Sequence, residues 1–410
     1  MLSRFSCLHQ RLDVRRLGPA RMDAVILAAG RGRRLRPLTD TRPKALLPIG
    51  GQTVLGRLCE QVTSHVERII IVTDYLGQQI REQVGTAVAG TPVVYVEQPE
   101  RRGTADAVAQ VADVVEGPFV LLNGDMVVDP SFIEMLADGS GWALCVKEVD
   151  DPQRYGVVDV DPRGQLRAVI EKPADPPSAL VNLGGYRLDA TVFPYLEQVA
   201  MSSRGELELT GIFEPALAAG HSVAVERYDG LWYDIGTPPA YLAAVAGVLS
   251  SWEDSAIDAT ASVDPTVQIT GRVAIGPRAQ IGPMTYLRGP AVIGADVHLG
   301  HAVEVKASVI MADTAIPHLS YVGDSLIGSD VNLGAGTVIA NLRHDDGAVT
   351  LGDGETQLTT DRRKLGAVIG DGVKTGINTS IMPGTRIGPH QTTLPGELIK
   401  GDLMGPGATD

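Results

Sequence analysis

Residues 273–300 read VAIGPRAQIGPMTYLRGPAVIGADVHLG. In this stretch an aliphatic residue returns at every sixth position, at Ile275, Ile281, Leu287, Ile293 and Leu299. Glycine directly follows four of these five residues. Because a hexapeptide repeat with one inward aliphatic side chain and small turn residues is typical of parallel β-helices, this stretch predicts that fold.

The repeat extends on both sides of this stretch. Its further positions are Ile257, Val263, Ile269, Val305, Ile327, Leu333, Ile339, Ile369, Ile381 and Ile387. A polar, charged segment from about Asn341 to Gly366 interrupts the repeat, and we expect it to loop out of one coil. We therefore expect a β-helix domain over residues 251–400 and a flexible tail over 401–410.

Residues 23–249 follow a different pattern. Apolar runs at 24–29, 69–72, 93–96 and 120–122 alternate with longer amphipathic stretches. This alternation is typical of an α/β layer fold with a mostly parallel sheet. We expect this first domain to cover residues 22–250, since 410 residues exceed what one hydrophobic core usually serves.

The overall composition narrows the function classes. A net charge of −14 disfavours broad binding to nucleic acids or to anionic membrane surfaces. Cys7, Cys59 and Cys145 are scattered without a CxxC pair, which indicates neither a disulfide framework nor a zinc site. Residues 1–21 are Arg-rich but lack the apolar core of a secretory signal, and we interpret them as a disordered extension. These features predict a soluble, cytoplasmic protein.

A basic, glycine-containing segment follows the first apolar run. It reads GRGRRLRPLTDTRPKAL at residues 30–46. Glycines after a strand allow backbone N–H groups to approach a phosphate, and the arginines and lysine supply positive charge within an acidic protein. The spacing matches neither the G-x-G-x-x-G dinucleotide pattern nor a Walker lysine. A triphosphate site is therefore favoured over an exposed basic loop.

Two aspartates are candidate metal ligands. Asp125 follows the apolar run 119–122, and the carboxyl ends of strands are where α/β sheets bind ligands. Asp234 lies in the segment WYDIGT at residues 232–237. Either residue alone could cap a turn. Together they supply the hard oxygen donors that Mg²⁺ prefers.

The string G-x-G-x-R-L-x-P-L-T-x-x-x-P-K-x-L over residues 30–46 resembles the sugar-1-phosphate nucleotidylyltransferase family, whose catalytic domain is Rossmann-like. The resemblance implies Mg²⁺ at Asp125 and Asp234, and transfer of a nucleotidyl group from a nucleoside triphosphate to a sugar-like 1-phosphate with release of pyrophosphate. The implied catalytic residues are Arg34, Lys44 and Lys172. The implied nucleotide-binding residues are Ala28, Gly30, Gly32, Arg34, Lys44, Gln98, Gly103 and Thr104. The implied acceptor-binding residues are Tyr155, Gly156, Glu171, Lys172 and Asn182.

The repeat domain resembles the acetyltransferase domain of bifunctional N-acetylglucosamine-1-phosphate uridylyltransferases and their archaeal relatives, which is a left-handed β-helix. The resemblance is carried by PHLSYVGD at residues 317–324. It implies acetyl-CoA as a second substrate and a site formed by Arg288, Lys306, His318, Tyr321, Asn332 and Asn341, with His318 as the general base. It also implies a homotrimer. A β-helix that only forms the trimer is the competing interpretation.

Substrate identity stays open at this level. The Ala-, Arg- and Val-rich composition resembles actinomycete proteins, among which members of this family activate sugars and cyclitols for antibiotic biosynthesis. GTP with valienol 1-phosphate is one candidate pair, and glucose 1-phosphate or glucosamine 1-phosphate with another triphosphate are the alternatives. Arg101 and Arg102, before the expected base-reading turn, leave the base undetermined. A non-enzymatic regulator is disfavoured because Arg34, Lys44, Asp125, Lys172 and Asp234 are all present.

Overall fold

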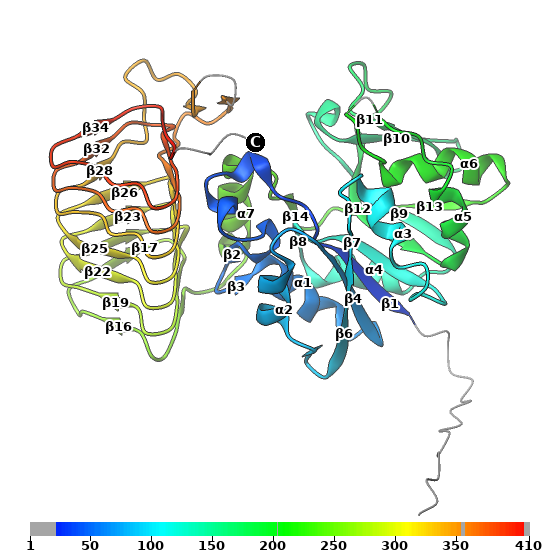
Figure 1. The fold of residues 1–410 in the computed structure, drawn as a ribbon, viewed down its shortest axis with the longest axis horizontal. Helices are drawn as coiled ribbons and strands as arrows, with labels where there is room; N and C mark the ends of the chain where they lie inside the picture. Colours follow the sequence, from blue (N-terminus) through cyan, green and yellow to red (C-terminus); the bar gives the residue numbers. More distant parts are fainter. Residues whose placement is uncertain (1–21, 203, 354–356, 406–410) are drawn as a thin grey trace, which may run out of the picture.

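The computed structural model describes residues 22–405, apart from 203 and 354–356. The expected disordered extension, residues 1–21, lies outside the described residues. The chain forms an α/β part followed by a β-helix that stands beside it (Figure 1). This confirms the two fold types that the sequence predicts.

The α/β part is built on a ten-stranded mixed sheet. Four neighbouring strands, in the order β7-β1-β4-β6, run parallel at its centre. The strands of this sheet are β1 (Asp23–Leu27), β4 (Arg68–Thr73), β5 (Ala87–Val88), β6 (Thr91–Glu97), β7 (Phe119–Asn123), β9 (Trp142–Glu148), β10 (Gly156–Val160), β11 (Leu166–Glu171), β12 (Leu180–Leu188) and β13 (Val223–Arg227). Separate short pairs are β2 (Pro48–Ile49) with β3 (Gln52–Thr53), and β8 (Met126–Val128) with β14 (Trp232–Asp234).

Helices cover this sheet and bury its apolar runs. They are α1 (Val54–Val62), α2 (Gly77–Val84), α3 (Thr104–Ala109), α4 (Pro130–Ala137), α5 (Phe193–Leu196) and α6 (Phe213–Ala218). A seventh helix, α7 (Pro238–Ser250), packs instead against β8 and the β-helix. Thr53 begins α1 by accepting the backbone N–H of Gly56 at 3.0 Å, the usual way to cap a helix start. None of the described helices is long and apolar enough to cross a bilayer.

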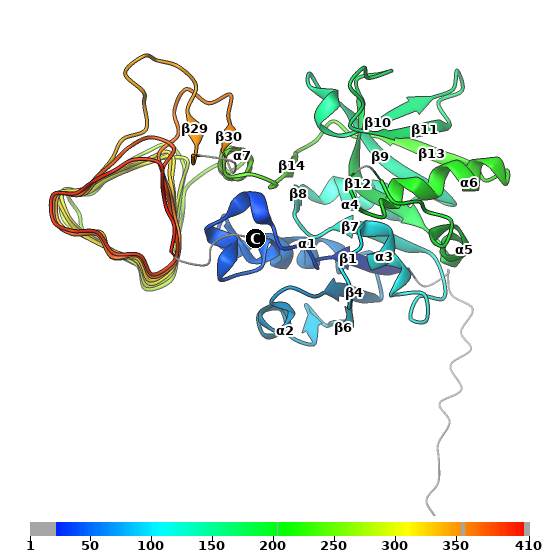
Figure 2. The ribbon, with the colours of Figure 1, turned by 45° about the horizontal axis from the view of Figure 1, so that its top comes forward.

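The β-helix has three parallel sheets that form the sides of a triangular prism (Figure 2). The first contains β15 (Ala256–Ile257), β18 (Val273–Ile275), β21 (Ala291–Ile293), β24 (Val309–Ile310), β27 (Leu326–Ile327), β31 (Val368–Ile369), β33 (Arg386–Ile387) and β35 (Asp402–Leu403). The second contains β16 (Ser262–Val263), β19 (Gln280–Ile281), β22 (His298–His301) and β25 (Ala315–His318). The third contains β17 (Gln268–Thr270), β20 (Tyr286–Arg288), β23 (Glu304–Lys306), β26 (Tyr321–Gly323), β28 (Val338–Ile339), β32 (Ser380–Ile381) and β34 (Leu398–Ile399). The aliphatic repeat residues fill the interior as one cluster.

The expected excursion leaves the prism between β28 and β31. It carries the hairpin β29 (Thr350–Leu351) and β30 (Leu358–Thr359), which Figure 2 shows beside α7. At the other end the predicted boundary at residue 400 is too early. β35 pairs with β33, and Asp402 accepts a hydrogen bond from Arg386 at 2.9 Å. Leu403 stands opposite Ile387 and packs on the interior cluster, but it follows Ile387 by 16 positions, which the six-residue spacing misses. The β-helix therefore continues at least to Leu403.

The two parts meet along α7 and the first sheet of the β-helix. Tyr241 and Val248 of α7 belong to one buried cluster with Val292 and Val309 of that sheet and with Leu351 of the excursion. A partly buried ion pair of 2.6 Å joins Arg42, two residues before Lys44, to Asp371 of the β-helix. The basic segment is therefore attached to both parts of the molecule.

Candidate active site

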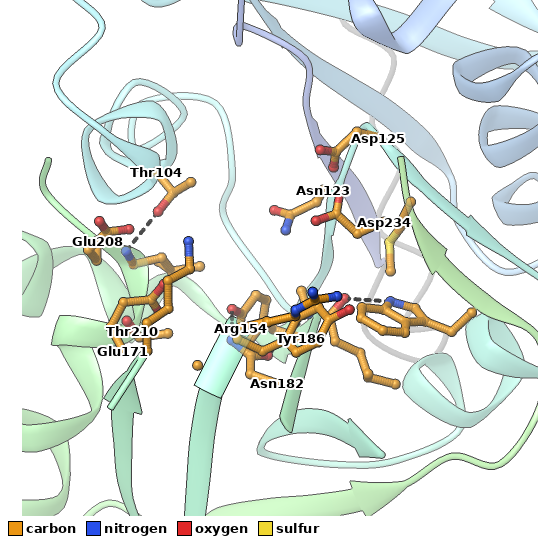
Figure 3. A pocket seen from close by; sticks show the side chains of 18 of the residues that line it. Thr104, Asn123, Asp125, Arg154, Glu171, Asn182, Tyr186, Glu208, Thr210 and Asp234 are labelled. Atoms are coloured by element: carbon orange, nitrogen blue, oxygen red, sulfur yellow. Dashed lines mark hydrogen bonds between the residues drawn. The ribbon is translucent and has the colours of Figure 1, made fainter. Parts of the chain in front are cut away.

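A cleft opens where β1 and β7 end, within the α/β part (Figure 3). The empty space within it is about 870 Å³, which includes volume open to solvent. Predicted residues that line it are Arg34, Thr104, Asp125, Tyr155, Gly156, Glu171, Lys172, Asn182 and Asp234. Further lining residues include Asn123, Arg154, Tyr186, Glu208, Thr210 and Trp232. Ala28, Gly30, Gly32, Lys44, Gln98 and Gly103 lie outside this lining.

A tight turn after β7 places Asp125 in the cleft. The N–H of Gly124 donates to the carbonyl of Leu27, at the end of β1, at 2.9 Å. A Cβ at Gly124 would lie only 2.7 Å from the same oxygen. Only glycine permits this close approach of two strand ends, and the residue that follows it is thereby directed into the cleft.

Pairing between β8 and β14 brings Asp234 next to Asp125. The two strands run antiparallel, with Asp234 opposite Met126 and Trp232 opposite Val128. The N–H of Ile235 also donates to the carbonyl of Asp125 at 3.3 Å. Two residues far apart in sequence therefore meet at the same end of the cleft, as Figure 3 shows for their side chains.

Lys44 is mostly buried and forms an ion pair with Asp125. Burial alone would raise the pKa of Asp125, but the charge and hydrogen bond of Lys44 outweigh it and hold that pKa below its usual value. Burial likewise works against the charged form of Lys44, and the two aspartates overcome it and raise the pKa of the lysine. Lys44 and Asp125 thus form an ionised pair.

Asp234 is in a less favourable position. Burial, and next the nearby charge of Asp125, raise its pKa to about 6. Its Oδ1 atom is buried and has no hydrogen-bond partner. A buried carboxylate oxygen without a donor, next to a second carboxylate, is suited to a bound cation.

Two carboxylates are enough protein ligands for a Mg²⁺ ion. The described residues contain no group of three or more His, Cys, Asp or Glu side chains suited to a metal. Mg²⁺ commonly uses one or two carboxylates and completes its shell with water and substrate phosphate oxygens. The donor set therefore fits Mg²⁺ that binds together with a phosphorylated substrate.

The basic segment forms a compact loop above β1. Gly32 has a φ of 64°, and Thr39 closes the loop by donating to its carbonyl at 2.9 Å. The 3-10 helix η1 (Arg33–Leu35) follows, and it buries Leu35 while it leaves both arginines exposed. Arg34 lines the cleft, whereas its neighbour Arg33 does not. Two consecutive residues of η1 thus differ, since Arg34 lines the cleft and Arg33 faces solvent.

The predicted base-reading residues lie at the start of α3. Gly103 has a φ of 129°, and a Cβ there would collide with the backbone of Leu207. Gln98 is buried and donates through Nε2 to the carbonyl of Gly103 at 3.1 Å and to Asp106 at 2.7 Å. Thr104 reaches the cleft and accepts the N–H of Leu209 at 2.8 Å. Gln98 therefore holds the turn, while Thr104 faces the ligand space.

The predicted acceptor residues come from β10, β11 and β12. Gly156 stands opposite Glu171 in the antiparallel β10–β11 pair. Lys172, at a φ of 45°, donates its N–H to the carbonyl of Tyr155 at 3.0 Å. Left-handed backbone at a non-glycine residue is uncommon and concentrates at functional sites. Asn182 is held by Tyr186, whose hydroxyl accepts from its Nδ2 at 2.6 Å.

Glu208 lines this wall and Arg204 supports it from behind through ion pairs, and sequence reasoning missed both residues. Arg204 pairs with Glu171 at 2.9 Å and with Glu208 at 2.6 Å. Burial raises the pKa of Glu171 above its usual value, and Arg204 opposes this shift. The segment from 200 to 210 carries no motif, so only the fold reveals it. Asn123 and Arg154 were detectable in principle, since Asn123 lies two residues before Asp125 and Arg154 directly precedes Tyr155.

The predicted acetyltransferase residues divide into two groups. Lys306 pairs with Asp324 at 2.6 Å, and Asn341 donates to the same carboxylate at 2.5 Å and to the hydroxyl of Tyr321 at 3.1 Å. Arg288 stands opposite Lys306 in the third sheet and pairs with Glu304 at 2.9 Å. His318 and Asn332 are exposed on the second side of the prism. A corner of the prism separates the histidine from the network.

Comparison with known proteins agrees with this geometry. The family model "Nucleotidyl transferase" matches residues 23–251, and the model "GMPPB C-terminal domain" matches residues 269–394. The chain is 36% identical to the "Bifunctional protein GlmU" of Methanococcus vannielii, over 93% of this chain and 96% of that relative. It is also 36% identical to the "Bifunctional sugar-1-phosphate nucleotidylyltransferase/acetyltransferase" of Sulfurisphaera tokodaii, over 93% and 98%. A crystal structure of a putative glucose-1-phosphate thymidylyltransferase from Bacillus anthracis, in complex with sucrose, covers 55% of this chain and 94% of its own at 29% identity, with a TM-score of 0.50.

Proposed function

Because the chain belongs to the nucleotidyl transferase family and is a sugar-1-phosphate nucleotidyltransferase, we propose that its cleft binds a nucleoside triphosphate, Mg²⁺ and a sugar-like 1-phosphate together. The observation that carries this proposal is the meeting of Asp125 and Asp234 beside Lys44, between the basic loop and the acceptor wall. Mg²⁺ held there would neutralise charge that develops on the α-phosphate.

The protein's own groups position two anions for one displacement. A phosphate oxygen of the acceptor attacks the α-phosphorus, the bond to the β-phosphate breaks, and pyrophosphate leaves. The acceptor phosphate is already ionised near neutral pH, so no side chain has to remove a proton. Arg34 stabilises charge on the α-phosphate, Lys44 orients Asp125, and Lys172 holds the acceptor phosphate.

The acceptor wall is suited to a polyhydroxylated ring. Glu171 and Asn182 offer hydrogen bonds to hydroxyls, and Tyr155 packs edge-on against Trp232 with ring centroids 5.6 Å apart. Hexose, hexosamine and cyclitol rings share these hydroxyls. We therefore propose glucose 1-phosphate, glucosamine 1-phosphate and valienol 1-phosphate as acceptors to compare, with GTP and valienol 1-phosphate as the antibiotic-pathway pair that the family resemblance suggests.

Pyrophosphate release tests this function. Purified protein with Mg²⁺ is assayed with each nucleoside triphosphate crossed with each of the three 1-phosphates. We expect release with at least one pair and none without the 1-phosphate. Absence of release with every pair, in protein shown to be folded by circular dichroism, would contradict the proposed reaction.

Acetyl transfer is a second candidate function. It is supported by the network of Lys306, Asp324 and Asn341 and by the bifunctional relatives. Exposed apolar side chains such as Leu319 and Leu398, on sides of the prism that α7 does not cover, support a homotrimer. We expect free thiol from acetyl-CoA in the presence of glucosamine 1-phosphate, and about a 10²-fold loss in His318→Ala if His318 is the base. An unchanged rate in that variant would refute its role.

A further inference from the structure

Arg154 is a cation in the acceptor wall that no family motif identifies. It ends the 3-10 helix η4 (Pro152–Arg154), directly before Tyr155, and it lines the cleft (Figure 3). The hydrogen bond from the Lys172 N–H to the Tyr155 carbonyl makes the backbones of the two segments neighbours. Arg154 and Lys172 therefore enter the same region of the cleft from adjacent segments.

Arg154 lies 3.9 Å from Asp151 of its own segment, but its hydrogen-bonded partner comes from the other domain. Asp361, in the excursion of the β-helix, accepts a hydrogen bond from the Arg154 guanidinium at 2.8 Å. The excursion holds Asp361 in place, since Thr360 and Leu365 on either side are buried. Thr360 donates to the carbonyl of Val349, and the N–H of Val349 donates to the carbonyl of Arg362 at 2.8 Å. The β-helix thus contributes a charged group at the rim of the cleft.

This ion pair is weaker than the contact that a phosphate could offer. The side chains of Arg154 and Asp361 are 58% and 78% exposed, and ion pairs at such positions contribute little. A guanidinium binds a phosphate dianion through two parallel hydrogen bonds with more charge. Arg204 already neutralises Glu171 and Glu208, so these carboxylates do not compete strongly for Arg154.

We propose that the acceptor phosphate displaces Asp361 from Arg154, so that the excursion of the β-helix sets the KM for the acceptor. The inference rests on the proposed nucleotidyl transfer. It makes the β-helix part of the acceptor site rather than a separate module. We expect loss of the Arg154 side chain to raise the acceptor KM and loss of the Asp361 side chain to lower it. A purely structural contact would not produce opposite changes.

The test compares Asp361→Ala, Asp361→Glu, Arg154→Ala and the double variant, in full-length protein, with acceptor and triphosphate varied separately. We expect Asp361→Ala to lower the acceptor KM about threefold and Asp361→Glu to restore it. Arg154→Ala should raise the acceptor KM about tenfold, and removal of Asp361 in that background should add nothing. The KM for the triphosphate should not follow these changes.

Asp346→Ala is the matched control, because Asp346 pairs with Arg363 within the same excursion at similar exposure. The proposal is overturned if Asp361→Ala behaves like Asp346→Ala, raises the acceptor KM, or keeps its effect without Arg154. If wild-type protein releases no pyrophosphate, the proposed function fails. In that case the binding of glucose 1-phosphate to the same variants is measured by calorimetry. We expect Asp361→Ala to bind glucose 1-phosphate more tightly than wild type and Arg154→Ala to bind it more weakly.

Discussion

Asp125→Asn and Asp234→Asn are each expected to reduce Mg²⁺-dependent pyrophosphate release by at least about 10³-fold. Each replacement removes a negative oxygen from the pair that fits Mg²⁺, and an amide oxygen carries no net charge to replace it. Glu148→Gln, a change at an exposed carboxylate paired with Arg227, should keep wild-type activity.

The two variants should differ in stability when the metal is removed with EDTA. Asp125→Asn leaves the buried Lys44 without its ion-pair partner, so the melting temperature should fall. Asp234→Asn removes a carboxylate whose buried Oδ1 has no donor and which repels Asp125, so the melting temperature should rise by about 3 °C. Shifts of the same sign in both variants, or activity above a tenth of wild type, would contradict the assigned roles.

Site residues that lie within a local sequence motif could be predicted from the sequence. Site residues that only tertiary contacts bring to the cleft had no local signal. The order of an apolar run, a glycine and an acid is visible in the sequence, so Asp125 could be placed at a strand end. The β8–β14 pairing that moves Asp234 beside it has no local signal, since both strands are short, so only the family resemblance linked the two aspartates in advance. Arg204 and Asp361 contribute charge from segments without motifs, so their roles depend on coordinates.

In the β-helix, too, the sequence pattern misses some residues that the structure places in the core. Ile281 pairs with Leu299, 18 positions on, but Leu299 pairs with Ile316, 17 positions on. Two corners, before Ile310 and before Ile327, are one residue shorter than the six-residue repeat requires. A strict search for the repeat therefore loses Ile310, Ile316 and Val322, although all three are buried in the core. Parallel pairing tolerates the shorter corners because the register between coils is set by the strands.

Arg34→Ala is expected to lower kcat by about 10³-fold while Arg33→Ala leaves it near wild type. The two arginines are adjacent in η1 and both exposed, but only Arg34 lines the cleft. Comparing the two variants therefore shows whether activity depends on the position of Arg34 or only on the positive charge of the loop. The loss should appear in kcat more than in the KM for the triphosphate, because charge on the α-phosphate grows towards the transition state.

Arg34→Lys should recover only part of this loss, since an ammonium group lacks the paired donors of a guanidinium. The measurement is steady-state pyrophosphate release at saturating Mg²⁺, with circular dichroism to verify that each variant is folded. The environment of Arg34 supports a specific geometry, because a Cβ on Gly236 would lie 2.8 Å from its guanidinium and 3.3 Å from Asp234. Equal losses in Arg33→Ala and Arg34→Ala would mean that the loop contributes only general positive charge, and the role given to Arg34 would be wrong.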